Sequence, residues 1–203
     1  MSRIIVFAGG CHSGKTTSAR ALGAHLQKLG FTVKYPELSM RNLTMGLSID
    51  ALRNNPSEYL NAEKQYIEAR LRLENEALED TSSTIYISDR TIFDTLFYLN
   101  TYIDTTRLSE TELDLFYDLS EKVRSFAALN AAKYYRVVLC YPIEPPINFD
   151  DKFRPRHLKR ASEFEFNGIK DLVFSYCYLH ANMYVKNELD TDFIGLITNS
   201  LYL

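Results

Sequence analysis

The sequence predicts a three-layer α/β sandwich, in which a five-stranded parallel sheet carries helices on both faces. The apolar run at residues 4–7 ends at two glycines, which is typical of a strand buried on both faces of a parallel sheet. Strand patterns then alternate with amphipathic helix patterns to the end of the chain. No internal repeat or low-complexity linker divides the 203 residues, so we expect one domain over residues 1–203.

The first half of the chain has a clear order of elements. After the first strand, Leu22, Leu26 and Leu29 recur at helical spacing in residues 17–29, and Gly30 is placed as a C-cap. Residues 31–35 form a second strand pattern that stops at Pro36. A long helix is expected from Ser57, as its N-cap, to about residue 79, because apolar side chains form one stripe there: Tyr59, Ala62, Tyr66, Ala69, Leu73 and Ala77.

The second half repeats the alternation. Residues 84–88 are β-favouring and end at Asp89, and residues 91–102 and 110–133 follow with helical patterns, the latter as one or two helices. Residues 135–140 predict a fourth strand, which Pro142 ends. A basic stretch follows, then a helix at residues 162–187 and a last strand at residues 193–197.

The composition limits the classes of function. At 46% hydrophobic residues the chain can bury a sizeable core, and its formal net charge of −3 lacks the positive field of non-specific nucleic-acid binders. No apolar run reaches the roughly 18–20 residues of a membrane span. Cys11, Cys140 and Cys177 show no CxxC spacing, which fits a reducing compartment. We therefore expect a cytoplasmic protein without a membrane partner.

The turn after the first strand carries a phosphate-loop motif. Its spacing is GxxxxGK[ST], and it lies between an apolar strand and an amphipathic helix, which is the setting that confirms the motif. Inward backbone N–H groups cradle phosphates, the lysine neutralises β- and γ-phosphate charge, and the hydroxyl ligates Mg²⁺. The motif therefore predicts ATP and Mg²⁺ as cofactors, bound by Gly9, Gly10, Cys11, His12, Ser13, Gly14, Lys15, Thr16 and Thr17.

The third strand ends in Asp89-Arg90, which indicates what happens to the nucleotide. Switch GTPases need an NKxD segment, which is missing, and ATPase motors place a second carboxylate where this chain has Arg90. Asp89 can hold Mg²⁺ together with Thr16, and Arg90 can reach the phosphoryl group during transfer. The pair favours phosphoryl transfer over hydrolysis.

These residues resemble a known family. The phosphate loop, Asp89-Arg90, Asp94 and Tyr98 are similar to the P-loop nucleoside and nucleotide kinases of the thymidylate-kinase and deoxynucleoside-kinase kind, and to the NadR-type AAA ATP-binding domain group. The resemblance covers nearly the whole chain in the order of its elements and implies a P-loop NTPase fold. The chain departs from thymidylate kinases at Thr91, where they have tyrosine after Asp-Arg.

The resemblance also implies acceptor-binding residues. Glu37, at the end of the second strand, would be the base for an acceptor hydroxyl, although it could equally be a carboxylate at the N-terminus of the next helix. Gln65 would read a base, or would be a solvated helical side chain. Asp94 lies one helical turn beyond Arg90, so it would hold that guanidinium or contact the acceptor sugar.

Residues 142–162 are expected to form a basic lid. Residues 152–160 contain five positive charges in an otherwise acidic protein, and lid arginines stabilise phosphoryl oxygens and exclude water. Arg154, by its similarity to a D-x-x-R segment, is the first candidate for this role and Arg160 the second. The alternatives are a solvated surface loop and a contact to nucleic-acid phosphates.

The sequence thus predicts a kinase that transfers the γ-phosphoryl group of ATP to a nucleoside, nucleoside monophosphate or related small acceptor. A kinase acting on a modified base or end in nucleic acid, and a P-loop ATP-binding regulatory module without kinase activity, remain as alternatives. A homodimer is left open.

Overall fold

The computed structural model describes residues 3–36, 38, 40, 49–142, 159–177, 183–186 and 192–202. Their centre is a five-stranded sheet of order β2-β3-β1-β4-β5, and every neighbouring pair of strands is parallel. The predicted fold class is confirmed. The strands are β1 (Arg3–Ala8), β2 (Val33–Lys34), β3 (Ile85–Asp89), β4 (Arg136–Cys140) and β5 (Met183–Lys186).

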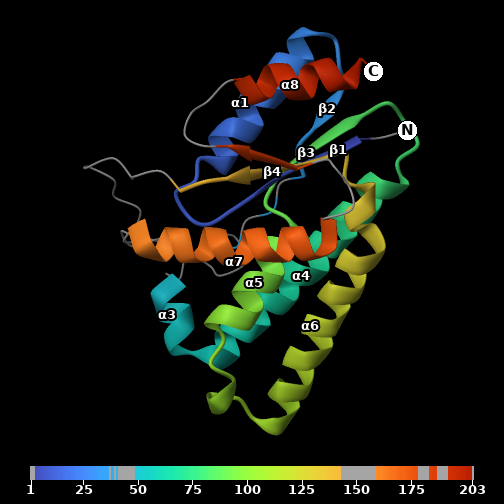
Figure 1. Ribbon diagram of the computed structural model, residues 1–203. Coiled ribbons are helices and arrows are strands. Elements are labelled where there is room, and N and C mark those ends of the chain that lie inside the picture. The colour runs from blue at the N-terminus through green and yellow to red at the C-terminus, as the bar shows by residue number, and fades with distance from the viewer. Residues whose placement is uncertain are drawn as a thin grey trace.

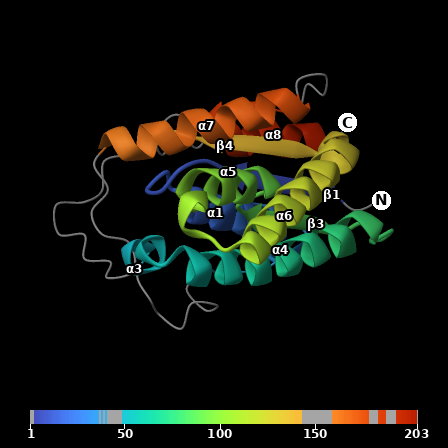
Figure 2. The same ribbon diagram turned by 90° about the horizontal axis from the view of Figure 1, so that it is seen from below.

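Helices cover both faces of the sheet, as Figure 1 shows. One face packs against α1 (Lys15–Lys28) and α8 (Asp192–Leu201). The other packs against α4 (Pro56–Glu79), α5 (Ile92–Tyr102), α6 (Glu110–Asn130) and α7 (Lys159–Cys177), seen from below in Figure 2. The short elements are α3 (Ile49–Asn54), η1 (Thr105–Arg107) and η2 (Ala131–Lys133).

The alternation of side chains along β1 builds two separate cores. Ile5 and Phe7 point to the side of α1 and α8, whereas Ile4 and Val6 point to the side of α4 to α7. All four are at most 3% exposed, as the continuous apolar run predicts for a strand covered on both faces. The strand therefore fixes the phosphate loop that follows it from both sides.

Helix caps explain where two of the helices begin. Thr91 and Asp94 form a capping box at the start of α5, which begins where it was predicted. The prediction of Ser57 as the N-cap of the long helix is wrong. The cap is Asn55, whose side chain accepts a hydrogen bond from the backbone N–H of Glu58, and Pro56 takes the first helical position, where its missing N–H costs nothing.

The C-terminal part of the chain differs from the prediction. Residues 193–197 lie in α8 and not in a strand, because Phe193, Ile197 and Leu201 are buried at a spacing of four, which is the period of a helix. The helix expected at residues 162–187 is α7, which ends at Cys177. The fifth strand is instead β5, within the range that had been assigned to that helix.

The three cysteines are buried, as small apolar groups are expected to be, and no disulfide joins them within the described residues. Within the described parts of the chain, no helix combines the length and the apolar character that crossing a membrane requires.

Candidate functional site

The phosphate loop joins the carboxyl end of β1 to the first residue of α1. Gly14 has φ 68°, a left-handed conformation that glycine adopts without strain, and Lys15 begins the helix directly after it. The Lys15 ammonium is buried and donates hydrogen bonds to the carbonyl oxygen of Gly10, at 2.6 Å, and to Ser13 Oγ, at 3.0 Å. The lysine thus lies across its own loop.

Thr16 and Asp89 come from different elements and meet beside this loop. The Thr16 hydroxyl donates a hydrogen bond to Asp89 Oδ2 at the end of β3. Thr16 is exposed and Asp89 is half-buried, so both oxygens can be reached by solvent. A hydroxyl and a carboxylate are hard oxygen ligands of the kind Mg²⁺ prefers, so the two residues fit the ion. Within the described residues, no three His, Cys, Asp or Glu side chains cluster as a protein-only metal site would require.

Arg90 follows Asp89 and has an unusual backbone conformation. Its φ is 104°, which is strained for a residue with a side chain, and its backbone N–H donates to the carbonyl oxygen of Phe7 at 3.0 Å. The guanidinium pairs with Asp94 at 3.8 Å and lies over the ring of Tyr98 at 5.1 Å. These contacts fix Arg90 at the carboxyl edge of the sheet.

Asp94 connects this turn to the phosphate loop. Its Oδ1 accepts a hydrogen bond of 3.2 Å from the backbone N–H of Gly9, and its Oδ2 accepts from Thr91. The side chain is 1% exposed. Its contact with Arg90 is the one that the first of its two interpretations expects, and a contact to an acceptor sugar stays a prediction.

Two charged residues of α4, Arg70 and Glu63, are buried in the structure, and the sequence motifs did not predict a role for either. Arg70 is fully buried and donates to Ser88 Oγ at 2.6 Å, to the Tyr66 hydroxyl at 3.0 Å and to the carbonyl oxygen of Arg90 at 3.4 Å. Glu63 is 2% exposed and its Oε2 has no hydrogen-bond partner within the described residues. A signal was present, because both belong to the stripe of Tyr59 and Tyr66 at spacings of three and four.

Glu165 of α7 was also missed. It is fully buried, and its Oε2 accepts hydrogen bonds from the backbone N–H of Cys11, at 2.7 Å, and from the Tyr98 hydroxyl, at 3.1 Å. Its Oε1 accepts from the Tyr102 hydroxyl at 2.7 Å. One carboxylate therefore links α7 to α5 and to the phosphate loop.

Burial and neighbouring charges shift the pKa values of two groups at the site, Lys15 and Glu63. Burial lowers the pKa of Lys15, the nearby charge of Arg90 lowers it further, and Asp94 and Asp89 oppose the shift. Burial raises the pKa of Glu63 to about 8, although Arg90 and a hydrogen bond from Tyr59 favour its ionised form. The charge of Arg90 thus acts on both the Lys15 ammonium and the buried carboxyl group of Glu63.

The remaining predicted site residues are either exposed, part of the loop backbone or outside the described residues. Gln65 is exposed on α4, Thr17 is exposed on α1, and Arg160 is exposed at the start of α7. Gly9, Gly10, Cys11, His12, Ser13 and Gly14 form the loop itself, in which His12 has φ 54°. Glu37, Arg154 and residues 143–158 of the expected lid lie outside the described residues.

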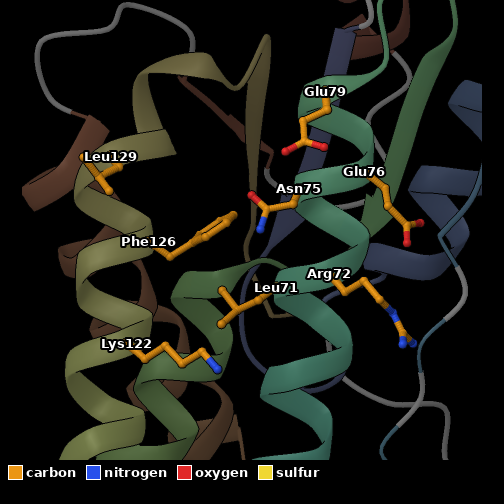
Figure 3. A pocket seen from close by; sticks show the side chains of 8 residues that line it. All are labelled: Leu71, Arg72, Asn75, Glu76, Glu79, Lys122, Phe126 and Leu129. Carbon is orange, nitrogen blue, oxygen red and sulfur yellow. The ribbon is translucent and has the colours of Figure 1, made fainter.

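A groove between α4 and α6, shown in Figure 3, is a separate feature. It is an open groove with a volume of about 600 Å³. The C-terminal halves of these helices lead to the amino ends of β3 and β4, so the groove lies at the opposite edge of the sheet from the phosphate loop. Its lining residues are Leu71, Arg72, Asn75, Glu76, Glu79, Lys122, Phe126 and Leu129.

Comparison with known sequences identifies a family. A family model described as an AAA domain matches residues 4–173. No curated protein sequence matches the chain.

Comparison with solved structures gives similar folds. A NadR protein in complex with NAD and AMP-PNP aligns with a TM-score of 0.60 at 15% identity, over 99% of this chain and 49% of that one. The chain thus spans about half the length of that protein. Deoxyadenosine kinase from M. mycoides aligns with a TM-score of 0.61 at 14% identity, over 98% of both chains. Thymidylate kinase from Candida albicans aligns with a TM-score of 0.52 at 15% identity, over 99% and 89%. At these identities the likeness establishes the P-loop kinase-like fold.

Proposed function

The chain belongs to the AAA domain family, and on this premise we propose that it is a phosphotransferase that moves the γ-phosphoryl group of ATP to a small nucleoside-like or nucleotide-like acceptor. The proteins of similar fold include a deoxyadenosine kinase, a thymidylate kinase and a NadR protein in complex with NAD and AMP-PNP. Their small, nucleotide-like ligands support an acceptor of the same chemical class.

The pair of buried cations carries this proposal. Lys15 and Arg90 are close enough for the charge of Arg90 to lower the pKa of Lys15, and both are largely removed from solvent. Asp94 and Asp89 offset part of the repulsion between these two buried cations, and an anion bound between them would offset more of it. A polyphosphate bound to the loop N–H groups supplies that anion. The arrangement therefore favours a triphosphate whose terminal group lies between Lys15 and Arg90.

The proposed transfer step accounts for the bond that forms, the bond that breaks and the proton that is released. An acceptor oxygen forms a bond to the γ-phosphorus while the bond from that phosphorus to the β–γ bridging oxygen breaks, and ADP leaves. The hydroxyl proton passes to a carboxylate, for which Glu37 remains the proposed base. Lys15 and Arg90 stabilise the charge on the transferred group, and Arg154 and Arg160 are proposed to close over it.

Thr16 and Asp89 would hold Mg²⁺, which supplies charge neutralisation to the phosphates when it is bound. Arg90 stands where a hydrolase would need a second carboxylate to polarise water, and this difference favours transfer to an acceptor over hydrolysis.

The test is to incubate the protein with γ-labelled ATP, Mg²⁺ and separate acceptors. The panel contains nucleosides, their 5′-monophosphates, nicotinamide riboside and duplex DNA, and Lys15→Ala is the matched inactive control. We expect labelled product from a small acceptor. Label on DNA alone would favour the nucleic-acid alternative. Absence of labelled product from every acceptor would favour the regulatory ATP-binding module.

A further inference from the structure

Glu165 is a buried acid that the proposed transfer step does not use. It lies on α7, is fully buried, and accepts a hydrogen bond of 2.7 Å from the backbone N–H of Cys11 in the phosphate loop. Removing a carboxyl group from water is unfavourable unless hydrogen bonds compensate for the loss. Natural proteins depart from an apolar core chiefly at functional sites. The contact of Glu165 with the loop therefore indicates a role in nucleotide binding.

The backbone of the phosphate loop is held against α7 at two neighbouring residues. A Cβ added at Gly10 would lie 2.8 Å from Cβ of Glu165 and 2.7 Å from the carbonyl oxygen of Ser162, so the glycine lets loop and helix touch. The carbonyl oxygen of Gly10 accepts from the Lys15 ammonium at 2.6 Å, and the next N–H, that of Cys11, donates to α7. A loop held in this way loses less conformational freedom when it closes around a polyphosphate, which strengthens binding.

Two tyrosines of α5 hold the carboxyl group in this position. The Tyr98 hydroxyl donates to Oε2 of Glu165 at 3.1 Å, and the Tyr102 hydroxyl donates to Oε1 at 2.7 Å. The two rings are stacked, with centres 5.6 Å apart. The Arg90 guanidinium lies over the ring of Tyr98 at 5.1 Å. The oxygen atom that accepts from the loop thus also fixes the ring over which Arg90 lies.

The helix that carries Glu165 also carries Arg160, which is proposed to close over the phosphoryl group. Arg160 is exposed in the first turn of α7, and Glu165 follows little more than one helical turn later. Because a helix is rigid over this distance, the contact of Glu165 with the loop also fixes where Arg160 lies relative to the loop.

From these contacts, and resting on the proposed function, we propose that Glu165 is a positioning residue that holds the phosphate loop through the Cys11 N–H and Arg90 through Tyr98, and so couples nucleotide binding to the docking of α7. Coupling of this kind is reciprocal. If the contact strengthens nucleotide binding by a given factor, bound nucleotide stabilises the docked helix by the same factor. Loss of the contact should therefore change nucleotide affinity and the protection of α7 together.

Substitutions of Glu165 separate hydrogen bonding from charge. Glu165→Gln can keep the contacts, because its amide oxygen accepts from the loop N–H while its NH₂ group donates to Tyr102, whose hydroxyl also accepts. Glu165→Ala removes them. Tyr98→Phe removes only the hydroxyl link and keeps the ring. Asp171→Asn, which changes an exposed carboxyl group of the same helix, is the matched control.

The experiment measures the affinities for ADP and ATP by calorimetry with Mg²⁺, the hydrogen exchange of α7 amides with and without ADP, and kcat for transfer. Glu165→Ala should bind both nucleotides about tenfold more weakly, which corresponds to one lost hydrogen bond to a charged group. Saturating ADP should slow the exchange of α7 about tenfold in wild type, Asp171→Asn and Glu165→Gln, and much less in Glu165→Ala. Tyr98→Phe should lose at least about threefold in kcat and keep its nucleotide affinity.

The outcomes separate this inference from the proposed function. Affinities and exchange rates that change as predicted, in a wild type that transfers no phosphoryl group, would refute the phosphotransferase and keep the positioning role. Wild-type nucleotide affinity in Glu165→Ala, full protection of α7 by ADP in that variant, or a Glu165→Gln protein as weak as Glu165→Ala would each overturn the inference.

Two further outcomes complete the test. Unchanged kcat in Tyr98→Phe would overturn the link from Glu165 to Arg90. If Glu165→Ala does not fold, Glu165→Leu takes its place in every comparison, because leucine fills a similar space without accepting a hydrogen bond.

Discussion

The guanidinium of Arg70 donates a hydrogen bond of 3.4 Å to the carbonyl oxygen of Arg90, whose φ is 104°. A conformation of this kind costs on the order of 1–3 kcal/mol and persists only where the surroundings hold it. Ser88 Oγ donates to the same carbonyl at 3.0 Å and accepts from Arg70 at 2.6 Å. Arg70 is therefore a positioning residue for Arg90.

Replacing Arg70 by lysine should lower kcat more than it changes binding of ATP. Lysine keeps the positive charge but cannot reach Ser88, Tyr66 and the Arg90 carbonyl at once, because it lacks the planar fork of the guanidinium. Because the Arg90 side chain would then be positioned less precisely, we expect kcat to fall at least about tenfold. We expect KM for ATP to change by less than about threefold. Steady-state kinetics with the acceptor found in the transfer assay measure both.

The matched control for this change is Arg72→Lys, because Arg72 is exposed on the same helix. It should leave both constants near their wild-type values. An Arg70→Lys enzyme with wild-type kcat, or one whose two constants fall together with its thermal stability, would show that Arg70 only supports the fold.

Lys15→Ala should abolish most of the transfer activity. The change removes a point charge at the transferred phosphoryl group, and the loss of one preorganised donor typically costs about a hundredfold or more in rate. Because a buried cation is removed together with its hydrogen bond to Gly10, we expect the melting temperature without ATP to shift by only a few degrees. Lys28→Ala, an exposed lysine at the other end of α1, is the control. Wild-type transfer by Lys15→Ala would contradict the phosphate-loop assignment.

The fold could be predicted where local patterns have one interpretation. The apolar run in β1 consists of β-favouring residues and is followed by the glycines of the phosphate loop, which together favour a buried strand and a turn, and that part is confirmed. The segment around Phe193 and Ile197 is short and apolar, and such a run fits a strand or a buried helix equally well. Its packing on α1 and β1 decides for the helix, and no local pattern contains that information.

The candidate site likewise has one part that the sequence predicts and another part that it does not. The contacts among Gly10, Ser13 and Lys15 arise within eight consecutive residues, so the spacing of the motif predicts them. Glu63 and Glu165 are charged residues on amphipathic helices, where a solvated position is the ordinary expectation. Each is buried by partners far away in the sequence, such as Arg90 and Cys11. Their roles depend on how the helices pack, and this could not be predicted from the motif.

The stability of the fold should depend on pH through Glu63. Its pKa in the folded protein is about 8, above its ordinary value of 4.5, so the folded state binds this proton more tightly than the unfolded state does. The stabilisation is complete below pH 4.5 and is lost as the pH rises towards 8. The upper limit of the loss is about 5 kcal/mol.

Glu63→Gln removes this titration. Relative to wild type, its free energy of unfolding should therefore increase between pH 5 and pH 8.5, by at least about 1 kcal/mol. Urea unfolding at the two pH values measures the difference, and Glu68→Gln shows the effect of removing an exposed charge from the same helix. A constant difference between Glu63→Gln and wild type would mean that Glu63 is ionised throughout.

The contact between the phosphate loop and α7 predicts opposite results for two glycine substitutions. A Cβ added at Gly10 would lie 2.7 Å from the carbonyl oxygen of Ser162 and 2.8 Å from Cβ of Glu165, so helix and loop would have to separate by several tenths of an ångström. A Cβ added at Gly195 meets nothing within 4 Å, and this glycine is exposed within α8.

Gly10→Ala should therefore destabilise the protein by about 1–3 kcal/mol, as overpacking does, whereas Gly195→Ala should stabilise it by roughly 0.5–1 kcal/mol because alanine favours a helix. Separation of α7 also pulls the Glu165 carboxylate away from the backbone N–H of Cys11, so Gly10→Ala should bind ATP more weakly than wild type and Gly195→Ala should bind it equally well. Urea unfolding and calorimetric titration with ATP measure the two effects. A Gly10→Ala protein as stable as wild type would refute the close packing of α7 on the loop. Weaker ATP binding by Gly195→Ala would show that loss of the contact between Glu165 and Cys11 is not what weakens ATP binding.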